Sequence, residues 1–404
     1  MSIFEKNIQE IDEGLILSES LSESLRENKS VLLHGKFRDV AVGGNLLVKV
    51  NTSIGMNDSQ NLEIELEKLN KLTSVGYRPD ILMDLSTVRT KTPLYKYAID
   101  IFGGPVGTLP HYLCFDHQHG IDLELLMHEI EKQAEIGVSF MTFHLTPRRY
   151  LYEKAKATRL TPVTSRGGGI ILKDMYLNNR DESILSQNFE RILCILKKYK
   201  VALSIGTTFR PATTVDALDE VQLEEIKHQS KYISAAKSAG VQVFMEGMGH
   251  APLHKISEYV KLIKCLHDIP VMPLGPITTD AAVGEDHISS AIGAAFMAYI
   301  GGADIINSIT REEHTGGVPT TDAVLEGLRA ARIAAHSVNI ARYPNLDKLE
   351  QATSESRANN YTCVVDSGLF KESNRQRFSM GCSRCGSICP LIFNREASLQ
   401  DTTS

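Results

Sequence analysis

One theme recurs from about residue 45 to residue 310: a short β-forming run, a polar turn and then a helical stretch. Such alternation produces parallel strands, because each helix returns the chain to the end of the sheet where the next strand begins. About eight runs predict an α/β fold closed as a (β/α)8 barrel, with an open doubly wound sheet as the alternative. The expected strands are 46–50, 81–85, 140–145, 169–172, 201–205, 241–246, 270–275 and 303–308, and the expected helices include 61–75, 123–136, 188–198 and 222–239.

Side chains of unusual chemistry follow the expected strands. In a closed barrel the loops after the strands converge on one mouth, where active sites are built. The sequence therefore predicts one shared site at this mouth. The residues concerned are Asn51, Ser53, Asp84, His144, Thr207 to Arg210, Glu246 and His250.

The chain changes character after the last expected strand. An Ala-rich helix pattern covers 321–341, and Pro344 follows it. Residues 346–380 lose apolar periodicity, which is typical of a linker or mobile arm, and a cysteine cluster comes next. The predicted organisation is an N-terminal segment (1–44), a catalytic barrel (45–345) and a linker with a C-terminal cluster-binding arm (346–404).

Composition excludes several classes of protein. The 404 residues are 42% hydrophobic, enough to bury a large core, and the net charge is −6. The basic residues are scattered, so no nucleic-acid partner is expected. The N-terminal stretch is acidic and lacks the apolar centre of a signal peptide, and no run of about 18 apolar residues predicts a membrane span. We therefore expect a soluble, cytoplasmic protein.

Seven cysteines are present, and three of them crowd into residues 382–389. This odd count and crowding are unlike a secreted disulfide framework and indicate a reducing compartment with a metal centre. Cys114, Cys194 and Cys265 stand singly in apolar stretches, which predicts buried, inert thiols.

The cluster reads Cys382-Ser-Arg-Cys385-Gly-Ser-Ile-Cys389. Gly386 lets the chain turn tightly, so three thiolates can reach one metal centre. Three protein ligands leave one iron of a [4Fe–4S] cluster open to S-adenosylmethionine. The alternative is a structural zinc, whose fourth ligand would be Cys363 or a histidine.

Two histidines follow expected strands near the barrel mouth. His250 ends the segment Glu-Gly-Met-Gly-His, and His314 ends Glu-Glu-His. Neutral imidazoles suit a divalent metal and leave room for substrate or solvent ligands. Taken alone, each histidine is more often an ordinary surface or core residue.

Residues 165–169 read Ser-Arg-Gly-Gly-Gly and form an expected glycine-rich turn with a cation. Backbone N–H groups and the Arg166 guanidinium can bind a phosphate, and Arg210 can add a second contact. The segment lacks the spacing of the common nucleotide-binding motifs, and a plain flexible turn is the alternative.

Taken in order, these segments resemble the phosphomethylpyrimidine synthase family of radical S-adenosylmethionine enzymes. The resemblance implies a (β/α)8 barrel, a homodimer and a cluster arm over the partner's barrel. It also implies 5-aminoimidazole ribonucleotide as substrate, a [4Fe–4S] cluster, S-adenosylmethionine, a second divalent metal (zinc or iron) and an external electron donor. The matching blocks are 48–55, 83–87, 107–112, 165–168, 209–220, 245–250, 274–295 and the terminal cysteines.

By position, the resemblance also implies site residues. The metal ligands would be His250 and His314, and the cluster ligands Cys382, Cys385 and Cys389. Glu246 and His144 would be catalytic, orienting the substrate and moving protons. The substrate contacts would be Ser53, Met83, Tyr112, His144, Ser165, Arg166, Gly167, Thr207, Arg210 and Glu246.

The sequence departs from the family at several of these positions. Residues 207–212 read Thr-Thr-Phe-Arg-Pro-Ala where the family has DGLRPG, so an acidic substrate contact is lost. Ser53 occupies a position where the family usually has asparagine, Met272 one where it has tyrosine, and Glu285 one where it has an aromatic residue. The cysteine spacing is one residue shorter than the family's CxxCxxxxC. A pocket that hydrogen-bonds its substrate is sensitive to such losses.

The departures favour the related anaerobic 5-hydroxybenzimidazole synthases, lyases that convert the same ribonucleotide into the lower ligand of a cobamide. The first alternative is the phosphomethylpyrimidine synthase of thiamin biosynthesis, and another rearrangement of a similar ribonucleotide comes next. A zinc-dependent barrel hydrolase or isomerase and a redox sensor complete the set of hypotheses.

Overall fold

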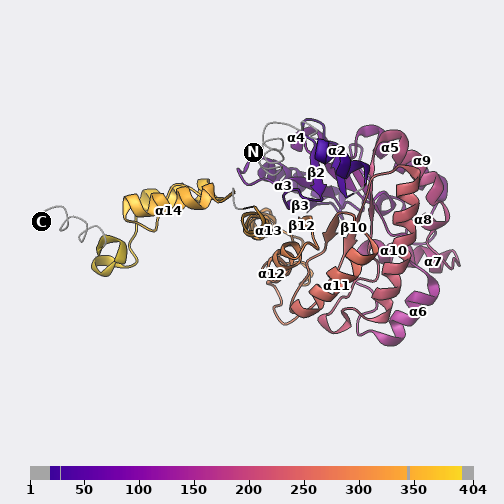
Figure 1. Cartoon of the computed structure of the whole chain (residues 1–404). Helices are drawn as coiled ribbons and strands as arrows, with labels where there is room; N and C mark the ends of the chain where they lie inside the picture. The colour runs from indigo at the N-terminus through magenta and orange to yellow at the C-terminus, as the bar shows by residue number, and fades with distance from the viewer. Residues whose placement is uncertain (1–18, 28, 344–345, 394–404) are drawn as a thin grey trace, which may run out of the picture. The chain divides into compact units, whose positions relative to one another are not determined.

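The computed structural model describes residues 19–27, 29–343 and 346–393 (Figure 1). Within these residues, one sheet has eight strands, ordered β11-β10-β9-β8-β5-β4-β3-β12, and every neighbouring pair is parallel. The (β/α)8 prediction is thereby confirmed. The strands are β3 Lys49–Ile54, β4 Ile81–Asp84, β5 Val106–Thr108, β8 Phe140–Phe143, β9 Ala202–Ile205, β10 Val243–Gly247, β11 Val271–Pro273 and β12 Ile305–Asn307.

Helices connect successive strands and cover the outside of the barrel (Figure 1). Their ends have the expected signals: Asp122 and Asp219 accept backbone N–H groups at the start of two helices, and Gly137 and Gly240 end them in the left-handed conformation. The α-helices up to residue 342 are α2 Glu19–Arg26, α3 Leu62–Ser74, α4 Leu94–Phe102, α5 Leu123–Ile136, α6 Arg149–Thr158, α7 Arg166–Leu177, α8 Ile184–Gln187, α9 Phe189–Tyr199, α10 Glu220–Ala239, α11 Leu253–Leu266, α12 Asp286–Tyr299 and α13 Thr321–Arg342.

One expected strand is wrong and one real strand was not expected. Residues 169–172 lie in helix α7, because Ser165 caps that helix and the apolar run is its buried face. The additional strand is β5, only three residues long and with Gly107 at its centre, so it gives almost no alternating pattern. The two errors cancel, which explains why the expected number of strands was correct.

One backbone and two side-chain hydrogen bonds close the barrel between β11 and β12. The N–H of Asp304 donates to the carbonyl of Val271 (2.9 Å), and the Asp304 carboxylate accepts the Val271 N–H (2.9 Å). Further along the same two segments, the Asn307 side-chain amide donates to the Pro273 carbonyl (2.8 Å). These bonds replace the backbone ladder at the join and leave no open sheet edge there.

A hairpin covers the end of the barrel where the strands begin. It consists of β1 Ser30–Leu33 and β2 Val40–Gly43, which pair antiparallel and are joined by residues 34–39. Because this end is covered, the opposite end is left for a site. The hairpin residues Val31, Leu33, Val40 and Val42 form one apolar cluster with Ile81, Phe140, Ala202, Phe244 and Ile305 from the strands.

The cysteines outside the terminal cluster do not share one environment. Cys114 is buried as expected, and burial raises the pKa of its thiol to about 12. Cys194 and Cys265 are exposed, so the prediction of buried thiols is wrong for both. Each lies on the solvent side of an amphipathic helix, α9 or α11, whose apolar neighbours gave a misleading local average.

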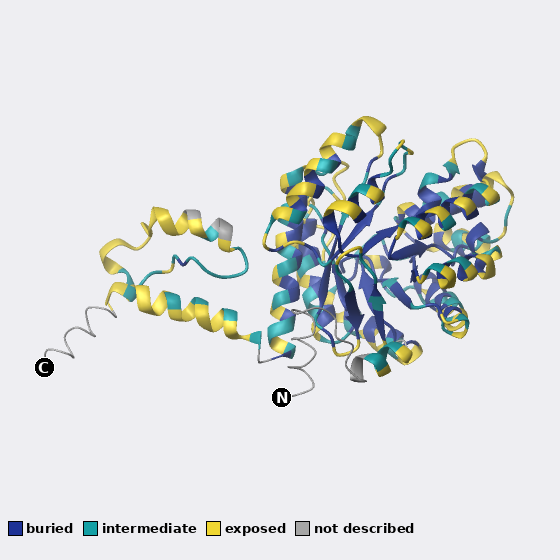
Figure 2. Cartoon of the chain, turned by 90° about the horizontal axis from the view of Figure 1, so that it is seen from above, coloured by how far each residue is buried: buried dark blue, intermediate teal, exposed yellow. Residues whose placement is uncertain are grey.

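The described residues divide into two compact units, one within 19–73 and 79–338 and the other within 74–78 and 339–393. The second unit contains α14 Lys348–Asn360 and α15 Lys371–Met380, in the segment where the sequence predicted a linker or mobile arm. No residue of α14 is buried, so a helix forms there without an apolar stripe (Figure 2). Residues 1–18 of the expected N-terminal segment, and Pro344, lie outside the described residues.

None of the described helices has the length and apolar character that crossing a membrane requires.

Replacing Asp304 by Ala should lower the free energy of unfolding by about 1–3 kcal/mol, because the N–H of Val271 would lose its acceptor at a buried join. Chemical denaturation measures the change. The matched control is Asp268→Ala, since that side chain is 62% exposed. Equal unfolding curves for the two variants would contradict the role given to Asp304.

Candidate active site

A cavity of about 370 Å³ opens where the strands of the barrel end. Residues from β3, β4, β10, β12 and several following loops line it, as the convergence of barrel loops predicts. Among the expected site residues, those that line the cavity are Ser53, Met83, Tyr112, His144, Ser165, Arg166, Arg210, Glu246 and His314.

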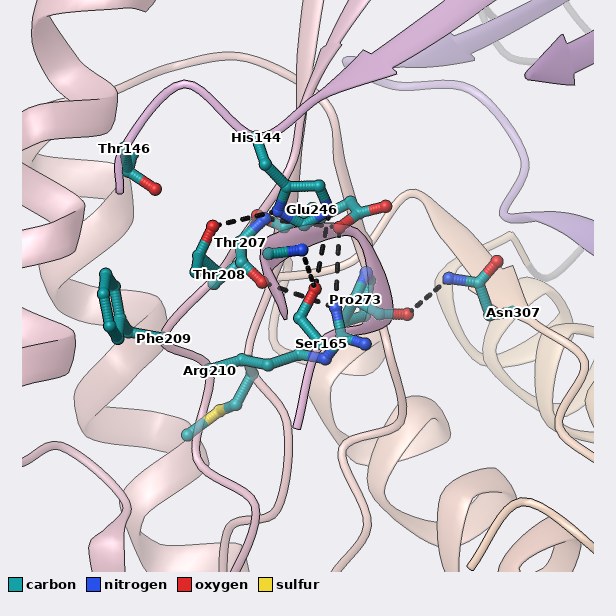
Figure 3. A network of polar contacts seen from close by, with 12 residues as sticks. His144, Thr146, Ser165, Thr207, Thr208, Phe209, Arg210, Glu246, Pro273 and Asn307 are labelled. Carbon is teal, nitrogen blue, oxygen red and sulfur yellow. Dashed lines mark hydrogen bonds and ion pairs between the residues drawn. The ribbon is translucent and has the colours of Figure 1, made fainter. Parts of the chain in front are cut away.

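His144 follows β8 and lies between two stretches of backbone. A Cβ atom on Gly167 would come within 2.4 Å of its ring, and one on Gly206 within 2.9 Å. The hydroxyl of Thr208 lies 3.0 Å from Nδ1, and that of Ser165 lies 3.4 Å from Nε2 (Figure 3). Burial holds the pKa of His144 well below its usual range, so the imidazole is neutral.

The glycine-rich segment forms the start of helix α7 rather than an isolated turn. The hydroxyl of Ser165 accepts the N–H of Gly168 (3.2 Å), which fixes the first helical turn beside the cavity. The positive end of a helix attracts anions, and the cavity wall here also contains Arg166 and Arg210. The arrangement is suited to a phosphate group.

Glu246 lies in β10, and its carboxylate is close to Arg210 of this anion site. Its Oε2 atom lies 3.6 Å from Nη1 of Arg210 and accepts the N–H of Thr207 (3.3 Å). Burial raises the pKa of Glu246, and the charge of Arg210 opposes the rise. A buried carboxyl group with a raised pKa beside a cation is a candidate for proton transfer.

Thr207, another expected substrate contact, is buried and is absent from the residues that line the cavity. Its hydroxyl donates to the carbonyl of Glu246 (2.9 Å) and accepts the amide of Gln229 (2.9 Å). The single donor of this hydroxyl and one of its two acceptor lone pairs are therefore used inside the protein.

His250 and His314 come together as expected. Their Nε2 atoms lie 3.2 Å apart. On the other side of each ring, Nδ1 of His250 lies 2.6 Å from Asp280, and Nδ1 of His314 lies 3.3 Å from Asp286. When Nδ1–H donates to a carboxylate, the lone pair of Nε2 is available to a metal ion, which is the usual support of a metal-binding histidine. These residues fit a divalent metal with two protein ligands.

The expected cluster ligands lie in the second compact unit. Cys382 and Cys385 are exposed and Cys389 is half-buried. Gly386 has a φ of +54°, the left-handed conformation that a tight turn between cysteines requires. In the part of the chain that the structure describes, no group of three His, Cys, Asp or Glu side chains has metal-binding geometry.

Some residues of the cavity were missed by the sequence analysis. Glu65 and Lys68 of α3 line it as a buried ion pair (2.5 Å), and Glu65 also accepts the N–H of Gly55 (3.0 Å). A signal was present, because both charges fall on the same helical stripe as the buried Leu69 and Leu72. A charged residue on the apolar stripe of an amphipathic helix indicates that the stripe faces a polar cavity within the protein at that point.

The chain matches the model of the radical SAM ThiC family over residues 4–396. The chain belongs to this family. It is therefore a radical S-adenosylmethionine enzyme, and the family implies an iron–sulfur cluster and S-adenosylmethionine as cofactors.

Curated relatives of the chain fall under two names. It is 36% identical to the phosphomethylpyrimidine synthase of Carboxydothermus hydrogenoformans, over 90% of this chain and 88% of the relative. It is 35% identical to the phosphomethylpyrimidine synthase of Pyrococcus furiosus (94% and 92% covered). It is also 32% identical to the 5-hydroxybenzimidazole synthase BzaA of Moorella thermoacetica (94% and 92% covered).

Replacing Gly167 by Ala should disturb the site although the residue is helical. An alanine in a helix normally adds about 1 kcal/mol of stability over glycine, but here its methyl group would meet the His144 ring. We expect a lower melting temperature and about tenfold weaker binding of ribose 5-phosphate. The matched control is Gly169→Ala in the same helix, where nothing lies within 4 Å of the added atom. Similar results for both variants would contradict the packing of His144.

Proposed function

We propose that the protein is a lyase that converts 5-aminoimidazole ribonucleotide into 5-hydroxybenzimidazole. The observation that carries this choice is the internal use of the Thr207 hydroxyl, which leaves Glu246 as the carboxylate beside Arg210. The relative named 5-hydroxybenzimidazole synthase supports it. The second candidate is a phosphomethylpyrimidine synthase, which the relatives of slightly higher identity favour.

The substrate phosphate would bind at the start of helix α7. Ser165, Arg166 and the backbone of Gly167 belong to that helix start, and Arg210 faces it from the loop after β9. Opposite charge and free N–H groups together would fix one end of the ribonucleotide. The rest of the substrate would then extend into the cavity toward Ser53, Met83 and Tyr112.

Glu246 and His144 are the groups proposed to handle protons. Burial raises the pKa of Glu246, so its carboxyl group would take up a proton at an Oε atom more readily than an exposed glutamate does. His144 stays neutral, and Nε2 of its ring faces Ser165, so it would orient the substrate by hydrogen bonding rather than by charge. The buried walls of the cavity would exclude water from the reacting atoms.

Two groups from outside the chain complete the proposal. Nε2 of His250 and Nε2 of His314 would bind a divalent metal, zinc or iron, which would act as a Lewis acid toward substrate oxygen. Cys382, Cys385 and Cys389 would hold the [4Fe–4S] cluster, which with S-adenosylmethionine supplies radical chemistry when bound. We further propose a cytoplasmic homodimer that receives electrons from an external donor.

The deciding experiment is an anaerobic assay of the reconstituted protein with 5-aminoimidazole ribonucleotide, S-adenosylmethionine and a low-potential reductant, read by mass spectrometry. Formation of 5-hydroxybenzimidazole would support the proposal. Formation of the phosphorylated hydroxymethylpyrimidine would replace it with the second candidate. If 5′-deoxyadenosine alone appeared, the ribonucleotide would be the wrong substrate.

Replacing Thr207 by Asp should lower product formation about tenfold or more. The new carboxylate cannot donate to the Glu246 carbonyl, and its charge would raise the pKa of Glu246 further. The control is Thr207→Ser, which keeps the hydroxyl and should remain near the unmodified rate. The assay above measures both, and full activity of Thr207→Asp would argue against the role of this hydroxyl.

Replacing Cys385 by Ala should reduce cleavage of S-adenosylmethionine at least about 100-fold and lower the iron content, because a cluster ligand is lost. Cys363→Ala is the control, since Cys363 is another exposed cysteine of the same unit. Cleavage at the unmodified rate by the Cys385 variant would exclude it as a ligand.

A further inference from the structure

Glu225 is a fully buried carboxylate on the inner side of helix α10. Its Oε1 atom accepts the hydroxyl of Thr146 (2.5 Å) and the N–H of Thr208 (2.7 Å). Its Oε2 atom accepts the N–H of Phe209 (2.8 Å). All three donor residues are themselves fully buried, so water is not available to replace the carboxylate as their partner.

The three donors belong to two loops of the barrel mouth. Thr146 comes two residues after His144, in the loop that follows β8. Thr208 and Phe209 belong to the loop that follows β9 and immediately precede Arg210 (Figure 3). A single carboxylate behind the barrel wall therefore holds both loops, while the catalytic cavity lies on their other side.

A second contact joins the same loops from the cavity side. The hydroxyl of Thr208 lies 3.0 Å from Nδ1 of His144. The backbone N–H of Thr208 is bound to Glu225, so the position of this hydroxyl depends on the carboxylate. The contacts form a continuous path from Glu225 through Thr208 to the imidazole.

We propose that Glu225 is a positioning residue of the ribonucleotide site. It fixes the backbone before Arg210 so that the guanidinium faces the phosphate, and it fixes Thr208 so that the His144 ring keeps one orientation. The proposal rests on the function proposed above. It names a residue outside the cavity on which two of the substrate contacts, Arg210 and His144, depend.

The chemistry of the three donors supports this role. Burial raises the pKa of Glu225 to about 7, while the contacts with Thr146, Thr208 and Phe209 oppose the rise. A buried carboxylate is costly unless hydrogen bonds compensate for the lost water, and here the compensating donors are those of the site loops. A residue needed only for core packing would be served better by an apolar side chain of similar size.

Glu225→Gln tests the proposal, because glutamine keeps the shape but directs an NH2 group at one of the donors. We expect the cluster-free protein to bind ribose 5-phosphate about tenfold more weakly, as measured by calorimetry. In the reconstituted enzyme we expect KM for the ribonucleotide to rise, with cleavage of S-adenosylmethionine in the absence of substrate unchanged. The control is Glu224→Gln, the neighbouring glutamate that contacts Tyr150 and Lys154 at the surface.

Nitrogen NMR of labelled histidines gives a readout that folding alone would not change. Thr208→Val removes the hydroxyl contact with Nδ1 but leaves the N–H bond to Glu225, so the His144 signal should shift. Thr208→Ser restores a hydroxyl and should return the signal to its original position. Glu225→Gln should shift the same signal.

The proposal would be overturned if Glu225→Gln only lowered the melting temperature while phosphate affinity and the His144 signal matched those of Glu224→Gln. Should Glu225→Gln fail to fold, an unchanged His144 signal in Thr208→Val would overturn the path from loop to imidazole. A wrong substrate would be recognised separately, since the unmodified protein would then fail to bind ribose 5-phosphate while the NMR shifts persisted.

Discussion

The join between β11 and β12 is the interaction on which the site depends. Elsewhere in the barrel the backbone ladder holds neighbouring strands, but here Asp304 and Asn307 supply side-chain bonds to the partner strand. Closure brings β12 next to β11, and the loop that follows β12 places His314 beside His250, which follows β10. An open sheet of the same strands would leave these two histidines at opposite edges.

Within the closed barrel, charge is distributed unevenly around the cavity. The start of α7 and two arginines make one wall positive, and Glu246 lies at the edge of that wall. On the α3 side, Glu65 and Lys68 neutralise each other. His144 contributes no charge because burial keeps its ring neutral. An anion would therefore be drawn to one end of the cavity, which gives an elongated ligand a defined direction.

The pattern of alternating strand and helix was sufficient to predict the barrel, and the residues after the strands were sufficient to predict most of its mouth. The sequence pattern was insufficient where a segment's local hydrophobic pattern does not indicate its place in the folded chain. β5 was missed because three residues around Gly107 carry no period, and 169–172 was misassigned because a short apolar run fits a helix face equally well. The contacts of Glu225 could not be predicted, because its partners are two backbone N–H groups 16 and 17 residues away and a hydroxyl 79 residues away in sequence.

Gly167 and Gly206 both place their backbone directly against the His144 ring. Every amino-acid replacement that a single-nucleotide change in a glycine codon produces adds a side chain. At these two positions each such replacement would therefore collide with the His144 ring. Natural lineages that lose this chemistry need not change any histidine, arginine or cysteine. In a comparison of diverged genes, a replacement at either glycine would therefore indicate loss of the site as clearly as a replacement of a residue that carries a functional group.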